Sequence, residues 1–231
     1  MTSSLLKWIA LLTMLIDHIG AIFFPQHEIF RIIGRISFPI FAFLLVQGFT
    51  HTRSRNAYLI RLLVFALIAE IPFDLCFSGV YYNFYSQSIM FELLIGFMAL
   101  VFAEKARKKP LYFFIVALLA FFSELIYASY GAYGIVLITF LYLLRRYRGA
   151  DILALLGITY LFYGFTSWGF SIVGYNYSIL TLNSVQLYAC FSAVLLVFYN
   201  GKRGGKSYKW LFYIFYPVHL FAIHLIDKYI Y

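Results

Sequence analysis

The sequence predicts an all-α, polytopic integral membrane protein with about nine transmembrane helices. Of its 231 residues, 64% are hydrophobic and only 12% are charged, whereas soluble domains are about half apolar and a quarter charged. A water-exposed exterior would need more polar side chains than this chain contains, so lipid must cover most of it. The abundant Phe and Tyr, 27 and 21 residues, suit the hydrocarbon core and its two interfaces.

The expected spans follow from apolar runs, because a helix needs about 20 apolar residues to cross the hydrocarbon core. Such runs succeed one another along the whole chain, with short connections and without a repeat or a soluble domain. We therefore treat 1–231 as a single transmembrane domain. The expected spans cover residues 5–24, 36–50, 58–77, 88–103, 110–128, 132–146, 150–166, 185–199 and 210–228.

The basic residues predict how the spans are oriented, because Lys and Arg concentrate in cytoplasmic loops. Most of the 18 Lys and Arg residues lie near the start of the chain or at every second connection; the exceptions are Arg31, Arg35 and Lys228. The segments without any charge are 78–87, 129–131 and 167–184. We expect a multi-pass protein of the plasma (inner) membrane with its N-terminus in the cytoplasm and its C-terminus outside. The long segment 167–184 is expected to form an interfacial or re-entrant element over a cavity.

Composition also excludes several classes of site. The formal net charge is +9, but the basic residues form short clusters between apolar runs instead of one stripe, so we expect no nucleic-acid partner. Cys76 and Cys190 lie far apart without metal-type spacing. We expect both to be packing residues, and we expect no metal site. Residues 1–4 lack the basic cluster of a signal peptide, so the first helix is expected to be retained.

Asp17 and His18 are the strongest candidates for chemistry, because an ionisable group at membrane depth costs at least about 2.5 kcal/mol to insert. Neighbouring residues on a helix point about 100° apart, so one is expected to face a cavity and the other a partner helix. A neutral buried imidazole suits the acceptance of a proton from a hydroxyl or amine. Asp17 either orients the imidazole through another side chain or pairs with an arginine such as Arg35. Alternatively, the two residues only bond helices together.

Arg31 and Arg35 lie on the side that the charge bias disfavours, and their spacing of four places both on one helical face. An anion is expected beside them, and the candidates are Glu70, Asp74, a substrate or part of an acyl donor. Contact with lipid headgroups is the alternative. Gly34 would let backbones approach closely around this charged group.

A second histidine, His219, follows Pro217 in the last expected span. Pro217 frees a backbone carbonyl and kinks the helix beside this histidine. A site could use that carbonyl; the alternative is a packed kink with a hydrogen-bonded histidine.

Phosphate binding is expected at two of the basic connections. Arg forks and Lys point charges both hold phosphates, and a glycine-flanked basic turn such as 199–204 can present backbone N–H groups to one. The residues expected to contact a ligand are His51, Arg53, Arg61, Lys202 and Arg203. The remaining basic clusters are explained by orientation and by anionic lipid.

Several short blocks in this order resemble the TraX family of membrane proteins, from the first expected span to the last. They cover 6–7 with 17–20, 33–44, 48–53, 61–62 with 70–75, 130–134, 199–204 and 215–220. Among them are Asp17-His18-Ile19-Gly20, Glu70-Ile71-Pro72-Phe73-Asp74 and Phe215-Tyr216-Pro217-Val218-His219. Each block is short, and the combination is specific.

The resemblance implies a function that the residues alone do not define. The named role of the family is N-terminal acetylation of conjugative pilin, and the family is similar to membrane acyltransferases that act on sugars and glycans. Those enzymes take acetyl-CoA from the cytoplasm and use a histidine of the first helix, which corresponds to His18. By the same resemblance, five further residues would line the cavity or bind the acetyl donor near this histidine. They are Arg35, Arg53, Glu70, Asp74 and His219.

Two positions depart from the family pattern, which has Asp where Ser129 stands and Thr where Glu92 stands. A relocated carboxylate or a changed acceptor would explain both. The 11 residues from Lys7 to His18 span about 16 Å of helix, comparable with an extended pantetheine arm. Phosphates at the cytoplasmic turns would therefore let a thioester reach His18.

Together these features predict an acetyl-CoA-dependent O/N-acyltransferase. The acetyl group would pass to an amine or hydroxyl of an extracytoplasmic or membrane-bound acceptor, either a pilin-like peptide or a glycan. A proton-coupled transporter is an alternative, because Asp, Glu and His within spans also mark proton relays, although no two-fold repeat is evident. A non-enzymatic assembly factor for a surface structure is the other alternative.

Overall fold

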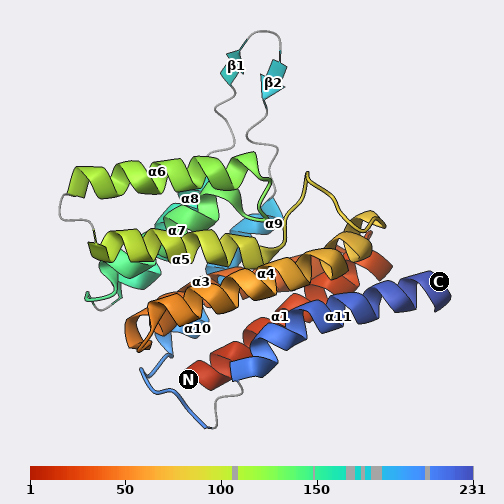
Figure 1. Ribbon diagram of the computed structural model, residues 1–231, viewed down its shortest axis with the longest axis horizontal. Helices are drawn as coiled ribbons and strands as arrows, with labels where there is room; N and C mark the ends of the chain where they lie inside the picture. The colour runs from red at the N-terminus through yellow and green to blue at the C-terminus, as the bar shows by residue number, and fades with distance from the viewer. Residues whose placement is uncertain are drawn as a thin grey trace.

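Helices form nearly all of the computed structural model, and their order and packing are shown in Figure 1. The structure describes residues 1–105, 109–147, 149–164, 170–172, 175–177, 184–205 and 209–230. The helices are α1 (Ser3–Phe23), α2 (Glu28–Gly34), α3 (Ser37–His51), α4 (Arg55–Ser78), α5 (Ile89–Lys105), α6 (Lys109–Leu125), α7 (Gly131–Leu144), α8 (Ala150–Tyr163), α9 (Ser184–Leu187), the 3-10 helix η1 (Tyr188–Phe191), α10 (Ser192–Val197) and α11 (Lys209–Ile230).

Each of the nine expected spans coincides with helix, and most boundaries differ by a few residues at most. The largest difference is at the second expected span, 36–50, because helix begins earlier, at Glu28. Arg35 and Ile36 join α2 to α3 in right-handed helical conformation. The sequence prediction placed the arginines outside the span because of their charge. They lie within the helical stretch because both guanidinium groups pair with the carboxylate of Asp17, as described below.

Three of the described helices are long and apolar enough to cross a membrane, namely 3–23, 28–51 and 210–230. Four shorter apolar helices cover 110–125, 131–144, 150–163 and 185–197. The last of these is built from α9, η1 and α10 in succession.

Local signals explain where two long helices begin. The side chain of Thr2 accepts a hydrogen bond from the N–H of Leu5 at the start of α1, and Ser54 does the same for Ala57 at the start of α4.

Two groups of helices meet along α3 and α5. Helix α1 packs on α2, α3 and α11, and α4 packs on α5 and α11. Helix α7 lies among α3, α5, α6 and α8. Large side chains at these contacts are fully buried, including Phe38, Phe49 and Phe97. Helices α1 and α11 run side by side in the same direction, so the two ends of the chain lie at opposite ends of the molecule (Figure 1).

The basic connections lie together at one end of the molecule. The turns after α3, α7 and α10 are found at the end where α1 begins, while the 79–88 loop and the end of α11 lie at the other end (Figure 1). The alternation of charged and uncharged connections in the sequence therefore corresponds to two ends of the helical assembly. Asp17 and His18, near the end of α1, lie towards the uncharged end.

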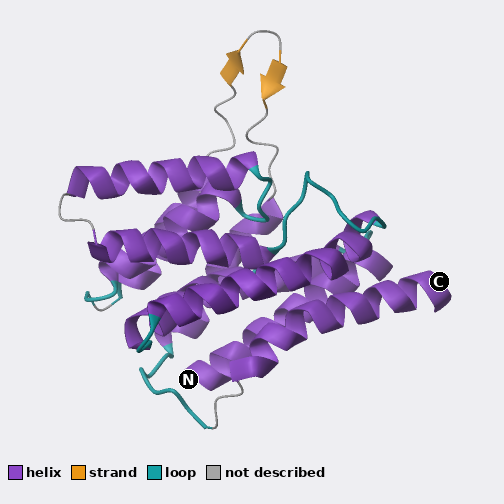
Figure 2. Ribbon diagram, viewed as in Figure 1, coloured by secondary structure: helices purple, strands orange, loops and turns teal. Residues whose placement is uncertain are grey.

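One described element is not helical. Strand β1 (Phe170–Ile172) pairs antiparallel with β2 (Tyr175–Tyr177), and this hairpin stands apart from the helices (Figure 2). It lies within the segment 167–184 for which an interfacial or re-entrant element was expected. The rest of that segment lies outside the described residues, apart from Ser184 at the start of α9, so this expectation stays a prediction.

Candidate active site

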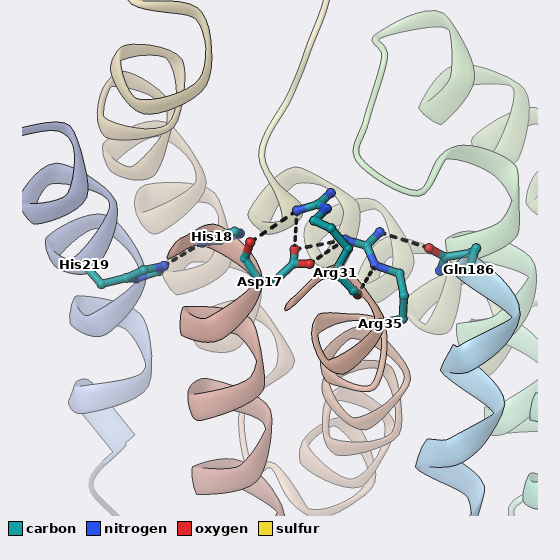
Figure 3. Close-up of polar contacts among 6 residues, drawn as sticks. All are labelled: Asp17, His18, Arg31, Arg35, Gln186 and His219. Carbon is teal, nitrogen blue, oxygen red and sulfur yellow. Dashed lines mark hydrogen bonds and ion pairs between the residues drawn. The ribbon is translucent and has the colours of Figure 1, made fainter. Parts of the chain in front are cut away.

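Asp17 and His18 are both buried, 7% and 9% exposed, and their side chains face different partners (Figure 3). The carboxylate of Asp17 accepts two hydrogen bonds of 2.9 Å from Nη2 of Arg35. Nη1 of Arg31 forms an ion pair of 2.9 Å with Oδ2 of the same carboxylate. The interpretation that Asp17 pairs with an arginine is therefore the one that the structure shows, while Glu70 and Asp74 are not the anions beside these arginines.

Close backbone approach makes this cluster possible. A Cβ atom on Gly34 would collide with the side chain of Asp17, so only glycine allows α2 to lie this close to α1. The sequence prediction of a close approach around a charged group is confirmed. Nη1 of Arg35 also donates to Oε1 of Gln186 at 3.0 Å, and its Nε donates to the carbonyl oxygen of Arg31 at 3.3 Å. Two guanidinium groups thus share one carboxylate, and the cluster carries an excess positive charge.

His18 faces α11 instead. Its Nδ1 lies 2.8 Å from Nε2 of His219, and the two ring planes are nearly parallel, at 3°. Nδ1 of His219 in turn lies 2.7 Å from the carbonyl oxygen of Phe215. The rings of Phe77 and Tyr216 surround His18, with centroids 5.3 and 6.2 Å away. The carbonyl used by His219 is that of Phe215, one helical turn before it. Pro217 has no N–H to donate to the carbonyl oxygen four residues earlier, which is that of Tyr213. The carbonyl that Pro217 frees is therefore not the one that His219 uses.

A cavity of about 510 Å³ extends from the basic end of the molecule towards His18. At the end where α1 begins it is lined by Ser3, Lys7, His51, Arg61 and Arg203. Its middle is mainly apolar and aromatic, and its far end includes Met14, Ile89, Met90 and Tyr216. Met14 precedes His18 by one helical turn, and Tyr216 contacts both His18 and His219. The far end of the cavity is thus one helical turn from His18, with Tyr216 between the cavity and the two histidines, neither of which lines it.

The glycine-flanked turn 199–204 lines this cavity beside the start of α1. The N–H groups of Ser3 and Ser4 donate to the carbonyl oxygens of Lys202 and Arg203, at 2.9 and 3.1 Å. Gly201 has a positive φ of 73°, which a turn with this geometry requires. The N–H of Lys202 donates to Oδ1 of Asn200 and is not available to a phosphate. The basic side chain that this turn contributes to the cavity is that of Arg203.

The structure places the other expected site residues as follows. His51 and Arg61 line the cavity, while Arg53 is exposed on the turn after α3. Two residues later, Arg55 at the start of α4 pairs with Glu104, at 2.6 Å. Glu70 and Asp74 are buried, and they accept hydrogen bonds from the N–H groups of the residues at 88 and 83, at 3.3 and 2.8 Å. These two carboxylates hold the loop between α4 and α5.

The two departures from the family pattern meet at one turn. Oε2 of the fully buried Glu92 accepts from the hydroxyl of Ser123 at 3.1 Å and from the N–H of Tyr130 at 3.4 Å. Ser129, the residue before this tyrosine, donates to the carbonyl oxygen of Gln87 at 2.7 Å. A carboxylate therefore reaches the turn from position 92, and the relocated carboxylate and the changed acceptor both stay predictions. The ring of Tyr130 stacks on Phe38 with centroids 3.7 Å apart.

Sequence reasoning missed three residues around the site. Gln186 contacts Arg35 from 151 positions away, and Phe77 and Tyr216 pack on His18. Nothing local in the sequence distinguishes Gln186 or Phe77 from their neighbours. The signal available for Tyr216 was its position immediately before Pro217, in the block that ends at His219.

These observations define a class of protein: a helical protein with several apolar helices, buried polar contacts from its first helix to α2 and to α11, and a cavity with basic residues at one end. The family described as TraX protein matches residues 2–227, and the chain belongs to this family.

Three relatives were found. The probable fimbrial assembly protein FimC, serogroup H1, of Dichelobacter nodosus is 28% identical over 93% of this chain and 91% of its own length. Protein TraX of Escherichia coli is 30% identical over 64% of this chain and 57% of its own length. An uncharacterized protein of Rickettsia prowazekii is 32% identical over 40% of this chain and 34% of its own. No solved structure matches the chain.

Proposed function

We propose that the protein is a membrane-embedded acetyltransferase that moves an acetyl group from cytoplasmic acetyl-CoA to an amine or hydroxyl of an extracytoplasmic or membrane-bound acceptor. The observation that carries this proposal is the cavity that runs from the basic end of the molecule to Met14 and Tyr216, of which Tyr216 packs on both histidines. A donor with charged phosphates and a long, uncharged arm suits a cavity with basic groups at one end and apolar walls beyond them.

The proposed topology follows the charge pattern. The nine helical regions would span the plasma (inner) membrane, with the N-terminus and the basic turns in the cytoplasm. Acetyl-CoA would enter at that end, where Lys7, Arg61 and Arg203 line the cavity. His51 would contribute a further polar contact there. The thioester would lie beyond Met14, within reach of His18.

The chemistry would be a direct transfer. The lone pair of the acceptor nitrogen or oxygen attacks the thioester carbonyl carbon, and His18 removes the proton from that acceptor atom. The tetrahedral intermediate carries a negative oxygen, which the excess positive charge of the Arg31, Arg35 and Asp17 cluster stabilises. The carbon–sulfur bond then breaks, and the coenzyme A thiolate takes the proton from His18. The products are the acetylated acceptor and coenzyme A.

The acceptor is proposed from the relatives. One of them is named a probable fimbrial assembly protein, so a pilin-like peptide is the first acceptor to test and a surface glycan is the second. Two other functions make different predictions. A non-enzymatic assembly factor would not need His18 for acetyl transfer, because it would transfer no acetyl group. A proton-coupled transporter would move protons without releasing coenzyme A.

One experiment separates these functions. The purified protein is reconstituted in proteoliposomes, and coenzyme A release, acetyl transfer to pilin peptides or glycans, and dissipation of a pH gradient are measured together. We expect acetyl transfer, detected by mass spectrometry as one added acetyl group, and its loss in His18→Ala. Transfer by His18→Ala at the wild-type rate, or proton flux without transfer, would overturn the proposal.

A further inference from the structure

We propose that His219 is the positioning residue of His18: it holds the imidazole in the tautomer whose Nε2 lone pair is the base. The inference rests on the proposed acetyltransferase function and assigns a role to one atom within it. It follows from a chain of contacts that links the carbonyl of Phe215 to His219 and then to His18 (Figure 3).

The first contact settles the protonation of His219. A backbone carbonyl can only accept a hydrogen bond, so Nδ1 of His219, 2.7 Å from the oxygen of Phe215, must carry the hydrogen. A neutral imidazole has a single N–H, and Nε2 of His219 therefore presents a lone pair. Both rings are buried, and the neighbouring arginine cluster already carries excess positive charge. An additional imidazolium here would be a buried charge without a counter-ion, so the neutral form is favoured.

The second contact passes this constraint to His18. Nε2 of His219 accepts, so Nδ1 of His18, 2.8 Å away, donates. The nearly parallel ring planes suit an N–H directed at a lone pair in the plane of the partner ring. The proton of neutral His18 is thus held at Nδ1, and its Nε2 keeps a lone pair. Among the residues that the structure describes, this nitrogen has no hydrogen-bond partner, and we assign it as the base.

Asp17 cannot perform this orienting role in the arrangement observed. Its carboxylate is held by Arg31 and Arg35 and is directed away from the imidazole (Figure 3). In many hydrolytic sites a carboxylate orients the catalytic histidine; here a second, neutral histidine occupies that position. His219 is itself oriented by its contact with the backbone carbonyl of Phe215, one turn earlier in the same helix.

The consequence for the reaction is specific. When Nε2 of His18 takes the acceptor proton, the positive charge that forms on His18 is shared through Nδ1–H with the lone pair of His219. When the coenzyme A thiolate recovers the proton from Nε2, the original tautomer is restored. One proton enters and leaves at Nε2 in each cycle, while the proton at Nδ1 of His18 stays within the pair.

A spectroscopic test does not depend on activity. Protein with ¹⁵N-labelled histidine is prepared in detergent micelles, and the His18 signals are identified by their absence from a His18→Gln spectrum. We expect an unprotonated Nε2 and a protonated Nδ1 at neutral pH in the wild type. The opposite tautomer of His18, or a doubly protonated His219, would overturn the inference even if the enzyme were fully active.

Activity measurements test the role. His219→Ala removes the acceptor, and we expect transfer to fall by roughly 100-fold, within the range that a general base contributes, with the KM for acetyl-CoA unchanged. His219→Gln can present an oxygen where Nε2 lies and should recover at least about tenfold of that loss. Wild-type turnover in His219→Ala, or no difference between the Ala and Gln variants, would contradict a positioning role.

His224→Ala is the matched control, because it removes another histidine of α11 that lies five residues further along. It should retain wild-type transfer. The two proposals fail differently: acetyl transfer that survives His18→Ala would refute the acetyltransferase function, whereas transfer that requires His18 but not His219 would refute only this inference.

Discussion

Replacing Asp17 with asparagine should destabilise the protein strongly, because it leaves a buried guanidinium without its counter-ion. The substitution keeps the size of the side chain and removes its charge. The side chain of Arg35 is 15% exposed and makes both of its Nη2 hydrogen bonds to this carboxylate. Removing one partner of a buried pair costs about 3–5 kcal/mol.

The second arginine adds little to this figure. The side chain of Arg31 is 37% exposed, and ion pairs open to solvent contribute about 0–1 kcal/mol. The amide of the Asp17→Asn variant would still offer one oxygen to Arg35, so the lower part of the range is expected, about 3 kcal/mol. Equilibrium unfolding in detergent micelles, followed by the loss of helical circular dichroism, measures this difference.

A double variant tests the physical reason. If the cost comes from the uncompensated charge of Arg35, then Asp17→Asn combined with Arg35→Gln should be more stable than Asp17→Asn alone. A loss below about 1 kcal/mol in the single variant would show that the pair is hydrated. A double variant that lost the sum of both single effects would show that the two side chains do not interact.

Three further predictions concern the cavity and the close helix contact. Arg203→Ala should raise the KM for acetyl-CoA by roughly tenfold, about 1.4 kcal/mol. Arg146 is exposed at the same end but does not line the cavity, so Arg146→Ala should leave the KM unchanged. A KM of Arg203→Ala equal to that of the wild type would remove Arg203 from the donor site. Met14→Ala should enlarge the far end of the cavity and raise the rate with propionyl-CoA relative to acetyl-CoA, and an unchanged ratio in a transfer assay would place the acyl group elsewhere. Gly34→Ala should lower unfolding stability by about 1–3 kcal/mol through overpacking against Asp17, and a fully stable variant would mean that α2 moves away freely.

The helical segments were predictable because their signal is local. Each expected span is a run of apolar residues, and such a run determines where a helix can lie whatever it packs against. The exception illustrates the limit. The helical stretch that begins at Glu28 contains Arg31 and Arg35, and a charge is compatible with that position only if a partner elsewhere in the chain neutralises it.

The candidate site was predictable in its membership and not in its contacts. Asp17, His18 and His219 were identified as ionisable groups within expected spans, and Arg35 as a basic residue next to one. The structure brings Asp17 onto Arg35 and His18 onto His219. Glu70 and Asp74 fit the same description, and their contacts in the structure are with the loop between α4 and α5. The sequence pattern is the same in both cases, so it does not separate a structural carboxylate from one in the candidate site.

The sequence by itself determined the helical class, the alternation of basic and uncharged connections, and the presence of costly ionisable groups in apolar helices, because composition and local periodicity express all three. Only the tertiary structure decided which of those groups meet. Asp17 and His18 are adjacent in the chain but face different helices, and His18 contacts His219 across 201 positions. Which side chains meet depends on how closely α1 approaches α2 and α11. The packing of the whole molecule sets these distances.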